Sequence, residues 1–132
     1  MNARARSALR IAVLLAAAAC SDTSGVTPGI VTLALVTPNA NDGAVTVVLT
    51  GPGITSLASA RSAYSVYWRV VSPTEARAIV VGDLNAGVMA TATVADVNQI
   101  DAYHVEVLEV ATRSDSVRTS TTGYAITLAG PH

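Results

Sequence analysis

The sequence predicts an all-β domain, and three features of the chain after residue 29 support that prediction. Apolar and polar residues alternate over short runs, which is the period of a half-buried strand. Turn clusters of Gly, Pro, Asn and Asp separate these runs, and β-branched residues are abundant whereas phenylalanine is absent. Seven predicted strands within about 100 residues fit a single antiparallel sandwich of two sheets.

The strands are expected in the following order. The first two lie at 31–35 and 45–49, and the turn cluster between them ends in Asp-Gly, which predicts a hairpin. Residues 54–61 are expected to form a loop or a single helical turn. The five remaining strands are expected at 62–72, 76–81, 88–94, 102–111 and 123–128.

Two of these strands carry more specific expectations. Residues 62–72 include the one tryptophan, Trp68, which shares a face with Tyr64, Val66 and Val70 and is therefore expected in the core. The apolar run at 76–81 predicts a strand that is covered on both faces.

The first 19 residues have the order of regions found in an export signal. Three arginines and no acid lie in residues 1–10, an apolar run fills 11–19, and small residues precede Cys20. The apolar run is far shorter than the roughly 18 to 20 residues that span a bilayer. We therefore expect a signal peptide at 1–19, a flexible tether at 20–29 and the β-sandwich domain at 30–130.

The end of this leader, Leu15-Ala16-Ala17-Ala18-Ala19-Cys20, resembles a bacterial lipobox, in which the thiol of the cysteine receives a diacylglyceryl group. The lipobox pattern prefers a larger aliphatic residue where Ala17 stands. The resemblance implies that the membrane is a partner through lipidated Cys20 and that the protein is a cell-envelope lipoprotein. In some bacteria an Asp directly after the cysteine marks retention at the inner membrane. Because Ser21 stands there in this sequence, an outer-membrane anchor is expected. The alternative is an ordinary signal peptide cleaved after Ala19.

A second resemblance concerns the sandwich itself. The segments 94–97 (VADV) and 101–107 (DAYHVEV) resemble the corner between strands E and F of immunoglobulin-like domains. The resemblance implies that Tyr103 bonds back to the backbone at that corner, that Val105 replaces the buried cysteine, and that Trp68 is the packed tryptophan of strand C. The glycine that immunoglobulin-like domains usually have between the acid and the tyrosine is absent here, since Ala102 alone separates Asp101 from Tyr103.

Charge and cysteine content exclude several function classes. Five arginines and nine acidic residues follow the leader, which gives a formal net charge of −4, and the arginines are scattered. Nucleic-acid binding is therefore not expected. Because Cys20 is the only cysteine, the domain contains neither a disulfide nor a thiolate metal site.

Candidate chemical groups are few. His104 and Glu106 lie two residues apart on one strand face, and with Asp101 and Glu109 they could form a metal cluster or an acid–base pair, although solvent-facing side chains are the simpler interpretation. Two sets could offer oxygen ligands to calcium or could simply form turns. These sets are Asn39, Asn41 and Asp42, and Asp96, Asn98 and Asp101.

Two further segments could bind a partner. The polar stretch 113–122 joins the last two strands, and loops at one end of a sandwich often carry binding sites. Tyr67 and Arg69 could form an exposed patch on the face opposite Trp68, or could pack beneath a neighbouring strand.

The function expected from the sequence is a non-enzymatic binding or structural module that contacts an envelope protein or a glycan through loops or a sheet face. No catalytic, cofactor or metal residue is assigned, and no serine lies in a G-x-S-x-G motif. The alternative is a small secreted hydrolase or metal-dependent enzyme that uses His104 and Glu106.

Lipidation at Cys20 predicts a definite mature mass. When the chain is produced in a bacterial host, intact-mass spectrometry should show a product that begins at Cys20 and carries acyl groups, and this product should partition into detergent. The Cys20→Ser chain should lack both properties. An unmodified product in the unsubstituted chain would contradict the lipid anchor.

Overall fold

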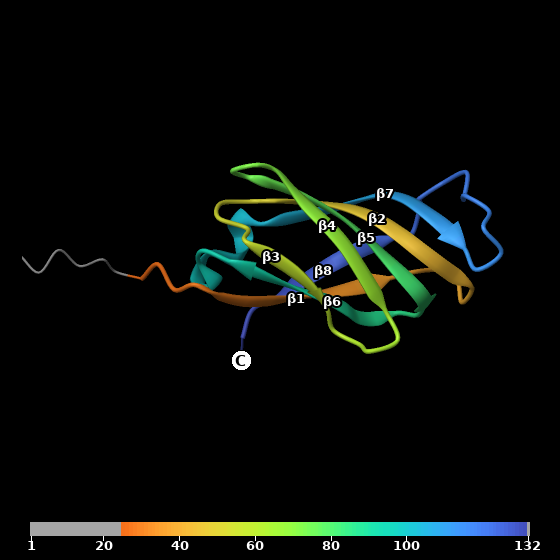
Figure 1. Cartoon of the computed structure of the whole chain (residues 1–132), viewed down its shortest axis with the longest axis horizontal. Coiled ribbons are helices and arrows are strands. Elements are labelled where there is room, and N and C mark those ends of the chain that lie inside the picture. The colour runs from red at the N-terminus through yellow and green to blue at the C-terminus, as the bar shows by residue number, and fades with distance from the viewer. Residues whose placement is uncertain (1–24, 132) are drawn as a thin grey trace, which may run out of the picture.

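The computed structural model describes residues 25–131, and within them the chain forms two antiparallel sheets of four strands each. The sheets pack as two layers (Figure 1). One sheet has the order β3 (Ser56–Ser59), β6 (Gly87–Val94), β1 (Gly29–Val36), β8 (Ala125–Ala129). The other has the order β4 (Ser65–Ser72), β5 (Glu75–Leu84), β2 (Asp42–Thr50), β7 (His104–Thr112). The predicted signal peptide and Cys20 lie outside the described residues.

The predicted sandwich is confirmed, with one strand more than expected. Residues 54–61 were expected to form a loop or a helical turn, but Ser56–Ser59 forms the short strand β3, which pairs with β6. Leu57 is its one buried side chain. The surrounding Ser and Ala have low strand propensity, so the local pattern is too short and too weak to show a strand.

The predicted hairpin between the first two strands is wrong. β1 pairs with β6 and β8, whereas β2 pairs with β5 and β7 in the other sheet. The turn cluster therefore carries the chain from one sheet to the other. In an immunoglobulin constant domain the first two strands lie in one sheet. The architecture is thus the expected sandwich, but the connection between its first two strands differs from that domain.

The core consists of aliphatic side chains that point inward from both sheets. Alternate residues of β1 and β2 are almost fully buried, as the period of a strand requires. In the part of the chain that the structure describes, no buried side-chain nitrogen or oxygen lacks a hydrogen-bond partner. The buried apolar residues are Val31, Leu33, Leu35, Val45, Val47, Leu49, Ile54, Leu57, Tyr64, Ala76, Ala78, Val80, Leu84, Met89, Ala90, Ala92, Val94, Tyr103 and Val110.

Tyr103 forms the corner that the sequence resemblance implied. Its buried hydroxyl donates to the carbonyl oxygen of Pro52 at 2.7 Å and accepts from the N–H of Asp96 at 3.3 Å. Between Asp96 and Tyr103 lies the 3-10 helix η1 (Val97–Ala102), where the chain crosses from β6 in one sheet to β7 in the other. The ring of Tyr103 lies so close to Gly51, at φ +146°, that any side chain there would collide with it.

The segment before β1 is attached to the same corner. The backbone N–H of Thr27 donates to the Asp96 carboxylate, and its carbonyl oxygen accepts from the N–H of Val97 at 2.8 Å. The side chain of Asn98 bonds to Gly25 and Thr27. Part of the predicted tether therefore belongs to the folded domain.

The prediction that Trp68 is buried in the core is wrong, because 39% of this residue is exposed. It stands opposite buried Ala78 in the strand register, so it does face inward as expected. However, β4 is an edge strand, and β3 at the corresponding edge of the other sheet has only four residues. The facing sheet is thus too short at this edge to cover Trp68.

The 76–81 strand is also covered on one face only. Within β5 the residues Ala76, Ala78 and Val80 are buried, whereas Arg77, Ile79 and Val81 are exposed. This leaves an open sheet face with apolar side chains.

Among residues 25–131, no helix has the length and apolar character needed to cross a bilayer.

Candidate functional site

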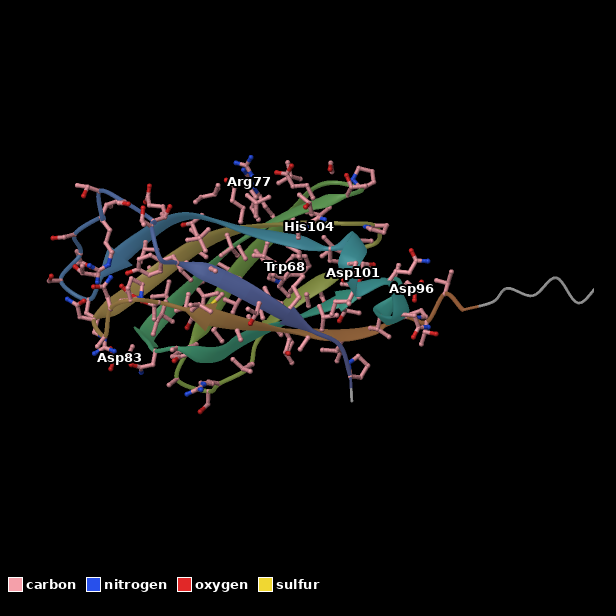
Figure 2. All side chains as sticks on the ribbon, turned by 180° about the vertical axis from the view of Figure 1, so that it is seen from behind. Trp68, Arg77, Asp83, Asp96, Asp101 and His104 are labelled. Atoms are coloured by element: carbon pink, nitrogen blue, oxygen red, sulfur yellow. The ribbon has the colours of Figure 1, made fainter. Side chains whose placement is uncertain are left out.

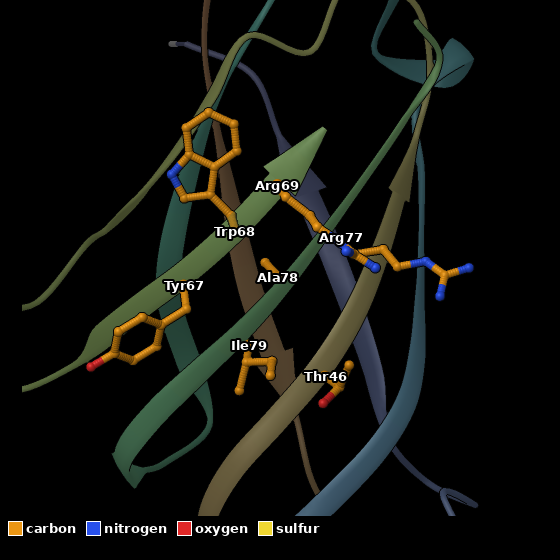
Figure 3. A pocket seen from close by; sticks show the side chains of 7 residues that line it. All are labelled: Thr46, Tyr67, Trp68, Arg69, Arg77, Ala78 and Ile79. Atoms are coloured by element: carbon orange, nitrogen blue, oxygen red, sulfur yellow. The ribbon is translucent and has the colours of Figure 1, made fainter. Parts of the chain in front are cut away.

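The sheet β4-β5-β2-β7 has a shallow groove on its outer face, with a volume of about 390 Å³. Figure 3 shows Ile79 between Tyr67 and Thr46, and Arg69 extending from β4 across β5 toward Arg77. Tyr67 stands opposite Ile79, and Ile79 stands opposite Thr46, so three neighbouring strands contribute one row of the groove. The residues that line it are Thr46, Tyr67, Arg69, Arg77 and Ile79, which face outward, together with Trp68 and Ala78, which lie between them along β4 and β5 and face inward.

Two arginines stand directly opposite each other across this groove. Arg69 on β4 and Arg77 on β5 are register partners, and like charges at such positions destabilise a sheet by roughly 0.2 to 1 kcal/mol. Arg77 is partly neutralised by Glu75, whose carboxylate lies 3.0 Å from its Nε. No acidic residue is among the groove-lining residues, although acids outnumber arginines in the chain after the leader. The groove therefore has an apolar floor with cationic groups at one side.

The alternation of burial explains why sequence reasoning found only part of the groove. Tyr67 and Arg69 were considered as an exposed patch, and the structure places both there, with Tyr67 64% exposed. Arg77 and Ile79 were not included because residues 76–81 were expected to be covered on both faces, and Thr46 on β2 has no sequence feature that marks a groove. The signal that could have found them is Arg77 itself, since an arginine inside an apolar run marks a solvent-facing position.

His104 and Glu106 both lie exposed on the outer face of β7, as the simpler interpretation predicted. His104 lines a different hollow, of about 400 Å³, which Asp101 also lines but Glu106 and Glu109 do not. Figure 2 shows His104 and Asp101 toward the η1 end of the sandwich. Among the described residues, no three or more His, Cys, Asp and Glu side chains are placed to hold a metal ion.

All members of the two candidate calcium sets except Asp101 make hydrogen bonds within the domain. The Asp96 carboxylate caps η1 by accepting from the N–H of Asn98 at 3.0 Å, and it also binds the N–H of Thr27. Asn39 and Asp42 belong to a second polar cluster at the opposite end of the sandwich, and beside it Asn41 accepts a hydrogen bond from Arg118. The turn-forming interpretation is therefore the one that the hydrogen bonds support.

This second cluster is centred on Asp42, the one fully buried acid among the described residues. Its Oδ2 accepts from the hydroxyl of Thr37 at 2.6 Å, and its Oδ1 accepts from the hydroxyl of Tyr124 at 2.8 Å and from Nε of Arg118 at 2.9 Å. Asn39 donates to the hydroxyl of Tyr124. We call these five residues the Asp42 cluster.

The electrostatics of the cluster favour the ionised carboxylate. Burial by itself raises the pKa of Asp42, but the hydrogen bonds from Thr37, Tyr124 and Arg118, together with the charge of Arg118, outweigh burial. The pKa of Asp42 is therefore below its ordinary value.

The predicted loop 113–122 folds back onto this cluster. Val117 forms a bridge with Ala111, and the N–H of Arg118 donates to the carbonyl oxygen of Val110 at 2.8 Å. The loop helps to line a hollow of about 370 Å³ together with Asn39 and Tyr124. It is thus held by the domain, while many of its side chains remain exposed.

Comparisons of this chain with protein-family models, curated proteins and solved structures give no match.

The lowered pKa of Asp42 predicts a specific acid sensitivity. The ordinary carboxyl pKa of about 4 applies to the unfolded chain, so the stabilisation by Asp42 is complete above that pH and is lost as the pH falls through the lower folded-state value. Asp42→Asn should lower the free energy of unfolding at pH 7 by roughly 2 to 4 kcal/mol, because Arg118 loses its partner. The variant should also lose part of the acid dependence, which urea unfolding across pH 2 to 7 measures.

Asp83→Asn is the matched control for this experiment. Asp83 also pairs with an arginine, Arg113, at 3.2 Å, but its side chain is 82% exposed. Its replacement should change stability little. Equal effects of the two substitutions would contradict the role of burial at Asp42.

Proposed function

We propose that this protein is a non-enzymatic binding module of the cell envelope, tethered through lipidated Cys20, which holds an acidic glycan in the groove over β4, β5 and β2. The observation that supports this function is the groove itself. It places the exposed ring of Tyr67, the apolar floor at Ile79 and the guanidinium groups of Arg69 and Arg77 on one open sheet face.

The chemistry of these side chains suits a sugar chain that carries carboxylates. The apolar C–H faces of a sugar ring stack on an exposed aromatic ring, and the ring of Tyr67 is available for this contact. A planar guanidinium binds a carboxylate through two parallel hydrogen bonds. The hydroxyl of Thr46 adds a group that can donate to or accept from sugar hydroxyls.

The shape of the groove favours an extended ligand over a small enclosed substrate. A small-molecule site usually buries most of its ligand, whereas this groove lies on an open sheet face. A polymer gains affinity by contacting several such shallow positions along its length. A protein partner through the same face is the alternative, and the test below separates the two.

A lipid anchor is compatible with this arrangement. Acyl chains on Cys20 would fix the protein to a membrane without any membrane-binding surface on the domain. The described chain begins at Gly25, beside η1, and the groove lies on the face of the β4-β5-β2-β7 sheet. The sheet face would therefore stay available to a glycan.

Titration calorimetry with two probe polysaccharides tests this function. The chain with Cys20→Ser should bind polygalacturonate, which carries a carboxylate on every sugar, and should not bind dextran, which is neutral. Tyr67→Ala and Arg77→Gln should each weaken binding about tenfold, because the first removes the stacking ring and the second removes one of the two guanidinium groups.

Arg113→Gln is the matched control, since it removes an exposed arginine that lies outside the groove. This control separates a site from general charge attraction. Equal weakening by Arg77→Gln and Arg113→Gln, or no binding of polygalacturonate at all, would contradict the proposed function.

A further inference from the structure

β4 offers the longest uninterrupted and uncovered sheet edge in the described domain, because its register against β5 is regular from Ser65 to Val70. The strands at the edges of the two sheets are β3, β8, β4 and β7. β3 and β8 have only four and five residues. β7 is interrupted at Leu108, where its register against β2 shifts, and Val117 bridges its far end. Short edges, bulges and covering segments are the usual protections against pairing with another chain.

The side chains of β4 also lack protection on both faces. This strand has eight residues and pairs only with β5, in regular register from Ser65 to Val70 and with a shift between Val70 and Ser72. Tyr67 is exposed on the outer face, Trp68 and Val70 are 39% and 48% exposed on the inner face, and Val71 is exposed at the register shift. Arg69 is its one charged residue. A long, apolar and free strand edge is a template for another strand.

We propose that two copies of this chain pair through β4 in antiparallel orientation, with Trp68 of one copy opposite Trp68 of the other. The two sheets then form one continuous sheet of eight strands. Both exposed edges disappear, because each copy supplies the strand that the other lacks.

The charge on Arg69 selects this register. A pairing centred on Trp68 aligns seven residues of each strand. It places Arg69 of each copy opposite Tyr67 of the other copy. A guanidinium beside an aromatic ring is attractive. A pairing centred on Arg69 also aligns seven residues, but it places two like charges opposite each other. A pairing centred on Tyr67 aligns only five residues of the strand.

The inner face of β4 supports the same register. In this pairing, directly opposed residues share a face, so Trp68 meets Trp68, and Val70 meets Val66 of the second copy. These are the inward-facing side chains that the short strand β3 leaves uncovered. A second copy therefore covers the apolar surface that the chain's own second sheet does not reach.

A single-cysteine cross-link tests the register. The full chain carrying Cys20→Ser and Trp68→Cys has one thiol, and opposed Cα atoms in an antiparallel pair lie about 4.5 to 5.5 Å apart, within disulfide range. Mild oxidation should convert most of this chain to a covalent dimer. Val70→Cys in the same background is the control, because the two positions would lie about 13 Å apart along the strands. Absence of the Trp68→Cys dimer, or equal cross-linking of both variants, overturns the proposed pairing.

Two charge substitutions at Tyr67 test the pairing without touching the partly buried Trp68. Tyr67 is 64% exposed, so neither substitution should affect folding. Tyr67→Arg places an arginine opposite Arg69 at two points and should raise the dimer dissociation constant in sedimentation equilibrium about tenfold. Tyr67→Glu places a carboxylate there and should keep the dissociation constant within about threefold. A monomeric unsubstituted chain, or equal effects of both substitutions, overturns self-pairing and leaves the edge to an extended segment of another protein.

Discussion

The buried carboxylate of Asp42 is the interaction on which one whole end of the sandwich depends. It lies where the chain crosses from β1 into β2, and its partners Arg118 and Tyr124 come from the segment between β7 and β8. A carboxylate without access to water is costly unless its oxygens are paired, and here both oxygens accept hydrogen bonds. The ionised group therefore requires its partners, and it fixes the start of β8 and the loop 113–122 in place. The aliphatic core holds the sheets together but does not specify these crossings.

The opposite end of the sandwich is fixed by hydrogen bonds without an ion pair. Tyr103 joins Pro52 to Asp96, and Asp96 in turn binds the backbone of Thr27. Figure 1 shows η1 and the loop 113–122 at opposite ends of the two layers. Four of the passages between the sheets are thus held at two polar corners: β1 to β2 and β7 to β8 at the one with the Asp42–Arg118 ion pair, and β2 to β3 and β6 to β7 at the one with Tyr103 and Asp96. These corners hold Asp42 and Asp96 in hydrogen bonds, whereas the open face of the β4-β5-β2-β7 sheet carries the groove with Tyr67, Arg69 and Arg77.

The sequence predicted the class of the fold and the position of most strands because alternation of buried and exposed residues is a local signal. It predicted the corner at Tyr103 because the segments 94–97 and 101–107 resemble the corner between strands E and F of immunoglobulin-like domains. Pairing is not local, so Asp42-Gly43 suggested a hairpin where the chain instead changes sheets. The face of Trp68 was predicted correctly, but its exposure depends on β3, a strand too short to be recognised. Only part of the groove was predicted, because Ile79 belongs to an apolar run that suggested a strand covered on both faces. In the described domain nothing covers the outer face of this run.

Hydrogen exchange of the folded chain tests the central claim, that Asp42 fixes one end of the sandwich. In Asp42→Asn, the amides of β8 and the N–H of Arg118, which bonds to Val110, should lose protection first. The amides between β2 and β5 should keep most of theirs, because their ladder continues far from the cluster. Equal loss of protection in both sheets would show that the carboxylate adds only to global stability. Unchanged exchange in β8 would contradict the claim directly.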